Sequence, residues 1–287
     1  MPTPATPVLP EALVRGIKQL EPLPLTAQRL VGMLSGAEVG AAAIAGLIEF
    51  DQAIAAAVLR AASTARHLGS SSPTVREAVQ RLGTVALLDL VLEGYLKKLR
   101  VATPLYDLSE QDLWLHGAAA QLAVRALAAE RPQARIPALA GTAALLHDVG
   151  KLIVSRYLKA DVRALLAHAE ARHLTFVAAE RDLLGTDHAG VGAALAVEWK
   201  FPADVADAIR RHHSLEFSNP TVMLDVVAVA NVVAKTIAVG LGAEGLNFAV
   251  DPGSCRRLGI DYATFGRVCL QTDAWLREVT GMHGIKR

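Results

Sequence analysis

The sequence has little cysteine and almost no excess of charge of either sign. Two of its 287 residues are cysteines, Cys255 and Cys269, and two thiols are too few for a disulfide framework. Lys and Arg number 29 against 28 Asp and Glu, which gives a formal net charge of +1. Such a balance offers no electrostatic basis for binding nucleic acid or an anionic membrane surface. We therefore expect no nucleic-acid partner.

The chain also lacks a long uninterrupted apolar run. Its most apolar stretch, residues 222–242, contains Asp225, Asn231 and Lys235, which would be costly to place in a bilayer. The first ten residues, MPTPATPVLP, have neither a basic start nor an apolar core, so no signal peptide is expected. We predict a cytoplasmic protein without a membrane span. The hydrophobic content of 52% indicates a globular chain.

Period-two runs of Val, Ile, Thr and Tyr are absent, whereas signals for helices recur. Residues 74–77, TVRE, are typical of a capping box and precede an apolar run that is expected to end at Gly83. Asn219-Pro220 indicates an N-cap followed by Pro at the first helical position. The spacing of such signals predicts about ten or more helices with short loops, and hence an all-α fold.

These signals divide the chain into four parts and one connecting segment. Residues 1–20 are expected to be a flexible N-terminal segment, and residues 21–100 an N-terminal helical lobe. Residues 100–108, RVATPLYDL, contain a Pro and no apolar periodicity, so we interpret them as a joint. Residues 109–242 are expected to form a second helical bundle, and residues 243–287 a C-terminal helical extension.

Common nucleotide-binding and nucleophile motifs are missing or out of context. The chain has no G-x-x-x-x-G-K-[ST] loop and no G-x-S-x-G elbow. Residues 240–245, GLGAEG, match G-x-G-x-x-G, but a dinucleotide-binding fingerprint follows a strand and opens a helix. Here the motif follows a long predicted helix. We therefore interpret it as a helix terminator with a flexible loop.

Five histidines and one aspartate form an ordered series with metal-ligand chemistry. Imidazole nitrogen and carboxylate oxygen are ligands of Zn, Fe, Mn and Ni. The aspartate follows an apolar run, residues 143–146, and a buried carboxylate is costly unless it is paired or binds a cation. An adjacent His-Asp pair also allows the carboxylate to bridge two metal ions. The candidate metal ligands are His116, His147, Asp148, His188, His212 and His213.

The remaining histidines are interpreted as ordinary core or surface residues. They are His67, His168, His173 and His283. A folded scaffold with a purely structural metal site remains an alternative to any catalytic interpretation of the series.

The order of the series resembles that of the HD-domain phosphohydrolases, and LLHDVGK, residues 145–151, is its most specific piece. The resemblance implies a helical bundle in which these residues hold one or two divalent ions, of Fe, Mn, Ni or Zn. It also implies hydrolysis of a phosphate ester by metal-activated water. Asp148 and Lys151 would then be catalytic, with Lys151 steadying the phosphate charge of a nucleotide ligand.

The first part of the chain resembles the front of an HDOD domain, the HD-related output domain of bacterial signalling proteins. The resemblance lies in residues 23–34, LPLTAQRLVGML, in residues 42–64, AAIAGLIEFDQAIAAAVLRAAST, and in residues 72–92, SPTVREAVQRLGTVALLDLVL. It implies an all-α fold in which a helical front lobe packs on an HD-like bundle, and it extends with the histidine series over about residues 20–242.

Two departures from the hydrolase pattern weigh against catalysis. HD hydrolases end their series with an Asp, whereas Asn231 stands at the matching place, and a neutral amide is a poorer ligand for a divalent cation. The cyclic di-GMP branch has Gly-Tyr-Pro after the paired histidines, whereas this chain has SLEFSNP, residues 214–220.

The leading hypothesis is therefore a bacterial signal-transduction protein of HDOD type. It would act without turnover, through contacts with other signalling proteins and with a metal ion bound. The alternative is a metal-dependent phosphohydrolase acting on a nucleotide or cyclic nucleotide.

Overall fold

In a computed structural model of the chain, the described residues form helices and no β-strand. The structure describes residues 9–34, 40–64, 74–99, 101–158, 161–214, 218–245, 248 and 251–282. These contain fifteen α-helices, two short 3-10 helices and an isolated β-bridge between Thr103 and Leu108. The predicted all-α fold is confirmed.

The chain divides into two compact units. One consists of Met1–Leu20, Arg100–Glu198 and Ala203–Arg287, and the other of Glu21–Leu99 and Trp199–Pro202. All the candidate metal ligands belong to the first of these units.

The smaller unit is a helical lobe whose last helix begins at the predicted capping box. The Glu77 backbone N–H donates to the Thr74 hydroxyl, and the Glu77 carboxylate accepts from the Thr74 backbone N–H. Gly83, with a φ of +74°, interrupts this helix where the apolar run was expected to end, and a second helical stretch follows it. The helices of the lobe are α2 (Leu25–Leu34), α3 (Ala41–Glu49), α4 (Gln52–Thr64) and α5 (Val75–Lys98).

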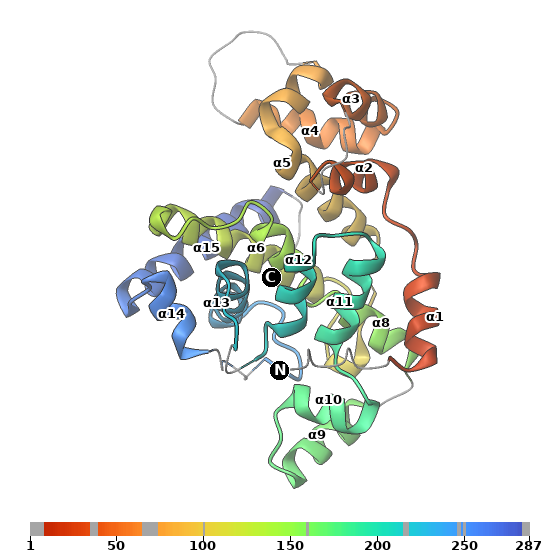
Figure 1. Cartoon of the computed structure of the whole chain (residues 1–287), viewed down its shortest axis with the longest axis vertical. Helices are drawn as coiled ribbons and strands as arrows, with labels where there is room; N and C mark the ends of the chain where they lie inside the picture. The colour runs from red at the N-terminus through yellow and green to blue at the C-terminus, as the bar shows by residue number, and fades with distance from the viewer. Residues whose placement is uncertain are drawn as a thin grey trace. The chain divides into compact units, whose positions relative to one another are not determined.

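The larger unit is a helical bundle with smaller helices at its sides (Figure 1). Its helix α6 packs against α7, α13 and α15, while α11 packs against α8 and α12. Helices α9 and α10 pair with each other, and α1 packs on α8 and α11. The helices are α1 (Glu11–Gln19), α6 (Asp112–Glu130), α7 (Ala140–Leu146), α8 (Gly150–Tyr157), α9 (Val162–Ala171), α10 (Phe176–Leu184), α11 (His188–Glu198), α12 (Ala203–Arg211), α13 (Val222–Thr236), α14 (Pro252–Leu258) and α15 (Tyr262–Met282).

Helix α13 is buried in the bundle, and each of its polar side chains has a polar neighbour. Asp225 accepts hydrogen bonds of 2.8 Å from the Ser254 hydroxyl and from Arg257 Nε, both on α14. Asn231 and Lys235 reach the histidine cluster described below. These partners offset the cost of burying polar groups in so apolar a helix.

Several sequence-based expectations need correction. Residues 11–19 form α1, with Leu13 and Ile17 buried, where a flexible segment was expected. The N-cap of α13 is Thr221, whose hydroxyl accepts from Leu224 N–H, and not Asn219. Within the expected joint, residues 104–106 form a 3-10 turn with a buried tyrosine. These segments are ordered by contacts that local sequence signals do not reveal.

Among the described residues, no single helix combines the length and apolarity required to cross a membrane. The bent pair Ala42–Glu49 and Gln52–Ser63 passes the same test only when its two arms are taken together.

Candidate metal centre

The six candidate ligands come from separate helices and meet in the interior of the bundle. His116 lies within α6, and His147 with Asp148 directly follows α7. His188 opens α11, and His212 with His213 directly follows α12. Five of the six residues are buried, and His213 has intermediate exposure. The side chain of His213 is nevertheless only 6% accessible.

Glycines let these helices approach closely enough for the side chains to meet. A Cβ atom on Gly150 would lie 2.0 Å from the carbonyl oxygen of His188, and one on Gly117 would lie 2.6 Å from the Leu145 carbonyl oxygen. The glycine in LLHDVGK is therefore a packing requirement between α8 and α11. It places the start of α11 beside Asp148.

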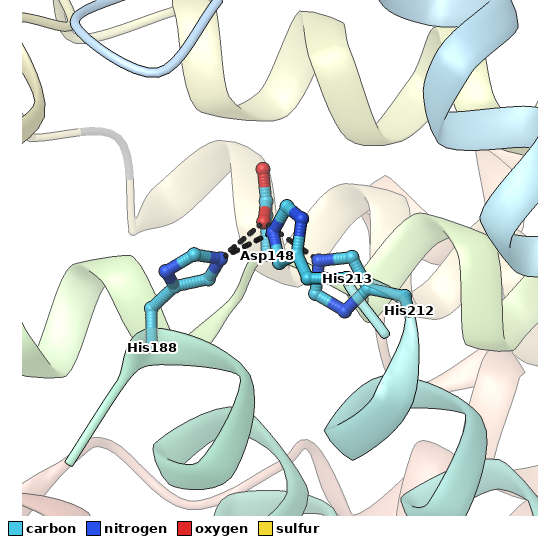
Figure 2. Close-up of side chains that lie close together, drawn as sticks. All are labelled: Asp148, His188, His212 and His213. Carbon is cyan, nitrogen blue, oxygen red and sulfur yellow. Dashed lines mark hydrogen bonds and ion pairs between the residues drawn. The ribbon is translucent and has the colours of Figure 1, made fainter. Parts of the chain in front are cut away.

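The Asp148 carboxylate stands at the centre, and its two oxygens face different imidazoles. Oδ1 lies 3.2 Å from His188 Nε2 and 3.5 Å from His212 Nε2. Oδ2 lies 3.5 Å from His147 Nε2 and 3.7 Å from His116 Nε2. Figure 2 shows the rings of His188, His212 and His213 gathered around this carboxylate. Asp148 is thus shared by two groups of ligand atoms.

In four of the histidines, the Nδ1 atom lies within hydrogen-bond distance of an oxygen atom, which fixes the orientation of the ring. An Nδ1–H that donates to a carbonyl or carboxylate oxygen leaves the Nε2 lone pair available, the arrangement typical of metal-binding histidines. The acceptors are Ala144 O at 2.6 Å from His147, Ile209 O at 2.7 Å from His212, Val239 O at 2.8 Å from His116, and Glu180 Oε2 at 2.7 Å from His188.

The surroundings favour neutral imidazoles and ionised carboxylates. Burial lowers the pKa of His116 and, more strongly, the pKa values of His147 and His213. Burial alone would raise the pKa of Asp148, but Lys151 and the neighbouring histidines hold it well below its usual range. Neutral imidazole and ionised carboxylate are the forms that bind metal.

His188 differs because carboxylates surround it. Burial alone would lower its pKa, but the charges of Glu180 and Glu244 and the nearby Asp148 carboxylate raise the pKa of His188 to about 10. The negative charge around His188 therefore favours a cation at this position.

Unsatisfied atoms at the centre fit a bound cation. Among the described residues, His147 Nε2, His212 Nε2 and Asp148 Oδ1 are buried without an aligned hydrogen bond, which is costly for a folded protein. His188 Nε2 and His213 Nε2 approach within 3.0 Å, and two such nitrogens need a proton or a cation between them. The donor set, imidazole with carboxylate, suits a divalent transition metal ion.

Asn231 lies at this centre, next to His116. Its Oδ1 is 3.1 Å from His116 Nε2. The Asn231 side chain comes from α13 and is 4% exposed as a residue, so it is part of the cluster and not a surface amide. Because its amide is neutral, Asn231 adds no negative charge next to His116.

Glu244 is a member of the cluster that the sequence analysis missed. It follows two glycines with positive φ, Gly240 at +56° and Gly242 at +52°. A Cβ atom on Gly242 would lie 2.3 Å from the Tyr106 carbonyl oxygen, which accepts a 2.8 Å hydrogen bond from Ala243 N–H. No strand precedes GLGAEG in the described chain, so the dinucleotide-binding context is absent. The motif instead forms a tight turn that delivers Glu244.

The Glu244 carboxylate is surrounded by nitrogen atoms. It lies 2.9 Å from Lys151 Nζ, 3.1 Å from Lys235 Nζ and 3.0 Å from His213 Nε2. Burial would raise the pKa of Glu244, but these groups hold it well below its usual range. In the sequence, Glu244 could have been noticed as a single charged residue among the glycines and apolar residues of segment 240–245.

Lys151 is buried and joins both acidic residues. Its Nζ lies 2.7 Å from Asp148 Oδ2 and 2.9 Å from Glu244 Oε2. Burial alone would lower the pKa of Lys151, but the two carboxylates raise it, so the side chain stays charged.

Hydrogen bonds connect His188 to Tyr106 through the Glu180 carboxylate. The Tyr106 hydroxyl donates to Glu180 Oε1 at 2.5 Å, and Glu180 Oε2 accepts from His188 Nδ1. Burial, followed by the charge of Glu180, raises the pKa of Tyr106, so the hydroxyl keeps its proton. Neither Tyr106 nor Glu180 was predicted, because each acts through another side chain.

The histidines outside the series lie away from this centre or outside the described residues. His168 pairs at the surface with Asp182, at 2.6 Å, and His173 lines a cavity beside α9. His67 and His283 lie outside the described residues.

Comparison with known proteins identifies the family. A model of the HDOD domain matches residues 20–215. An uncharacterised protein of Treponema pallidum is 24% identical over 234 residues, which are 80% of this chain and 45% of that protein. The chain therefore spans less than half of the length of that relative.

Solved structures show the same fold. An HDOD domain protein of unknown function from Geobacter sulfurreducens is 26% identical, with a TM-score of 0.64 over 93% of this chain and 96% of its own. A "Putative phosphohydrolase" from Shewanella amazonensis SB2B is 24% identical, with a TM-score of 0.61 over 91% and 98%. A "Putative signal transduction protein" from Marinobacter aquaeolei VT8 is 22% identical, with a TM-score of 0.65 over 95% and 65%. With most of its length matched by the family model, the chain belongs to the HDOD family.

Proposed function

We propose that this chain is a cytoplasmic bacterial regulatory protein that binds a divalent transition metal ion and acts through contacts with other signalling proteins. The observation that carries the metal site is the convergence of histidine Nε2 atoms on Asp148, with Nδ1 of four rings already engaged. The regulatory role is supported by the family and by the name of the Marinobacter aquaeolei relative.

One ion is favoured over two, and it would lie on the Oδ1 side of Asp148. The ligands there are Asp148, His188, His212 and His213, with the Glu244 carboxylate 3.0 Å from His213 Nε2. On the Oδ2 side the Lys151 ammonium lies 2.7 Å from the carboxylate, and Asn231 is neutral. A positive charge so close repels a second cation.

The residues around the site also argue against turnover. A bound ion of this kind supplies Lewis acidity and lowers the pKa of a ligated water. Phosphate-ester hydrolysis further needs positive groups free to bind the phosphate charge. Here Lys151 and Lys235 already contact the Glu244 carboxylate. As folded in this structure, the chain is therefore proposed to be a metal-binding regulator that does not hydrolyse a phosphate ester.

The test is elemental analysis of the purified protein, combined with melting curves with and without a chelator. We expect Fe, Mn, Ni or Zn in the protein, and a stabilisation of about 2.7 kcal/mol when free metal is a hundredfold above its dissociation constant. Asp148→Ala should lose the metal, whereas His168→Ala, which removes a surface histidine, should keep it. Protein without metal, melting identically with chelator, would refute the metal site.

A metal-dependent phosphohydrolase acting on a nucleotide or cyclic nucleotide is the second candidate. Lys151 beside Asp148 favours it, because a phosphate on the ion would lie within reach of that ammonium. The assay is a panel of cyclic dinucleotides, nucleoside monophosphates and a chromogenic phosphodiester, each with Mn, Fe, Ni and Zn. Turnover that disappears in His147→Ala would replace the regulatory proposal with this one.

A further inference from the structure

The six proposed metal ligands are buried, so an ion needs a path to reach them. Their side chains are at most 6% accessible, and that of His213 has the largest accessible fraction. A divalent ion in water carries about six water molecules, which at about 30 Å³ each occupy about 180 Å³. An ion that approaches the folded chain therefore needs a space of that order beside the ligands, in which it can lose its water.

The cavity beside α9 meets this requirement. Its volume is about 610 Å³. Its wall includes three exposed residues, Leu166, Glu170 and His173, and two buried residues, Phe176 and Glu244. The cavity therefore extends from the surface of the bundle to a buried carboxylate, and it is large enough for a hydrated divalent ion.

The buried end of this cavity adjoins the ligand set. Glu244 Oε1 lies 3.0 Å from His213 Nε2, and Glu244 Oε2 lies 3.8 Å from His188 Nε2. Glu244 Oε2 is also buried without an aligned hydrogen bond, although Lys151 Nζ lies 2.9 Å from it. One carboxylate thus separates the cavity from two of the imidazoles that would bind the ion.

The charges along this path favour a cation. Among the described residues, the cavity wall contains Glu170 and Glu244 but no Lys or Arg. Deeper in the bundle, the side chains around the imidazoles carry one more negative than positive charge. They are the carboxylates of Asp148, Glu180 and Glu244 and the ammonium groups of Lys151 and Lys235. An excess of negative charge along a cavity attracts cations into it.

We propose that this cavity is the entry route by which the divalent ion reaches and leaves the metal centre, with Glu244 at its inner end. The ion meets Glu170 at the exposed rim, loses water against Glu244 and passes to His213. The inference rests on the proposed function, because an entry route requires a metal site. It adds to that function the face of the bundle through which the site is loaded and emptied.

Ala169→Trp obstructs the route, and stopped-flow mixing with Zn²⁺ measures the effect. Ala169 lines the cavity from α9 and lies outside the ligand cluster. An indole there blocks the path without touching the bound ion. We therefore expect uptake by chelator-treated protein and release to excess chelator to slow by the same factor, at least tenfold, with an unchanged dissociation constant. Ala167→Trp is the matched control, because Ala167 is exposed on the same helix and does not line the cavity.

A positive charge at the rim tests the same route without filling the cavity. Leu166→Lys should slow uptake of Zn²⁺ about tenfold at low ionic strength, and much less in 1 M salt, where a charge is screened within about 3 Å. Leu183→Lys is its control. The two leucines are similarly exposed, at 43% and 45%, but Leu183 does not line the cavity.

The outcomes separate the entry route from the metal site. Equal rates in wild type, Ala169→Trp and Ala167→Trp overturn the route and leave the metal site in place. If Ala169→Trp does not fold or changes the dissociation constant, the two lysine variants decide, and equal uptake by Leu166→Lys and Leu183→Lys overturns the route. A wild type that takes up no Zn²⁺ and contains no metal on purification overturns the metal site and the route together.

Discussion

Asn231→Asp adds a negative charge at the place where the metal centre lacks one. The side chain is buried, and its Oδ1 lies 3.1 Å from His116 Nε2. A carboxylate there would complete a set of His116, His147 and Asp148 on the Oδ2 side. We expect the variant to bind a second metal ion, or to bind the first more tightly.

The magnitude follows from opposing electrostatic effects. A unit charge about 4 Å from a divalent ion gains about 8 kcal/mol at an effective dielectric constant of about 20. Burying another carboxylate costs several kcal/mol. The Lys151 ammonium, 2.7 Å from Asp148 Oδ2, further reduces the gain. A net of about 1.5–3 kcal/mol remains, which corresponds to a roughly 10- to 100-fold lower dissociation constant.

The assay is competition against a chromogenic chelator, with the number of bound ions read from the same titration. In excess chelator, Asn231→Asp should be less stable than the wild type by about 1–3 kcal/mol, because two buried carboxylates would then flank one imidazole. Asn219→Asp, the same substitution at an exposed position, is the control and should change neither quantity. Unchanged stoichiometry and affinity in Asn231→Asp would contradict the placement of Asn231 beside the metal.

Three further substitutions or modifications test other parts of the site. Gly150→Ala should destabilise the protein by about 1–3 kcal/mol in urea unfolding, since its Cβ meets the His188 carbonyl oxygen, whereas Gly94→Ala, with open space around it, should not. Glu180→Gln should weaken metal binding about 10- to 100-fold through His188, measured by the same chelator competition, and an unchanged affinity would exclude this supporting role. Burial raises the pKa of Cys269 to about 11, so little thiolate exists at pH 8. Its alkylation should be roughly a hundredfold slower than that of free cysteine and should accelerate up to pH 11.

The histidine series could be found in the sequence because the His147-Asp148 pair has a local signal and the order of the other members resembles a known family. His147 and Asp148 follow an apolar helix, where a charge has no packing role. His212 and His213 follow α12, an amphipathic helix that itself carries four charged residues. Helical periodicity likewise predicted the all-α fold. The spacing alone did not place these helix ends side by side, and the family resemblance supplied that step.

The rest of the cluster depends on contacts between distant segments. Tyr106 lies in a segment without apolar periodicity, and only the folded chain shows its carbonyl oxygen holding the turn that carries Glu244. The glycines of that turn matched a nucleotide-binding pattern whose required strand is absent from the described chain. Helix α1 was missed for a simpler reason. Leu13 and Ile17 have helical spacing, but the preceding prolines suggested a flexible lead-in.

Asn231 and Glu244 distribute the negative charge of the centre differently from the hydrolase pattern that the sequence resembles. The negative charge absent at Asn231 would have faced His116, on the Oδ2 side of Asp148. The negative charge present at Glu244 faces His213, on the other side, and contacts both lysines. The cluster therefore contains the Glu244 carboxylate in addition to that of Asp148. Glu244 comes from a loop, and it also lines the cavity beside α9. A charge in that position supports a metal ion held near His213 while it competes with any anionic ligand for Lys151 and Lys235.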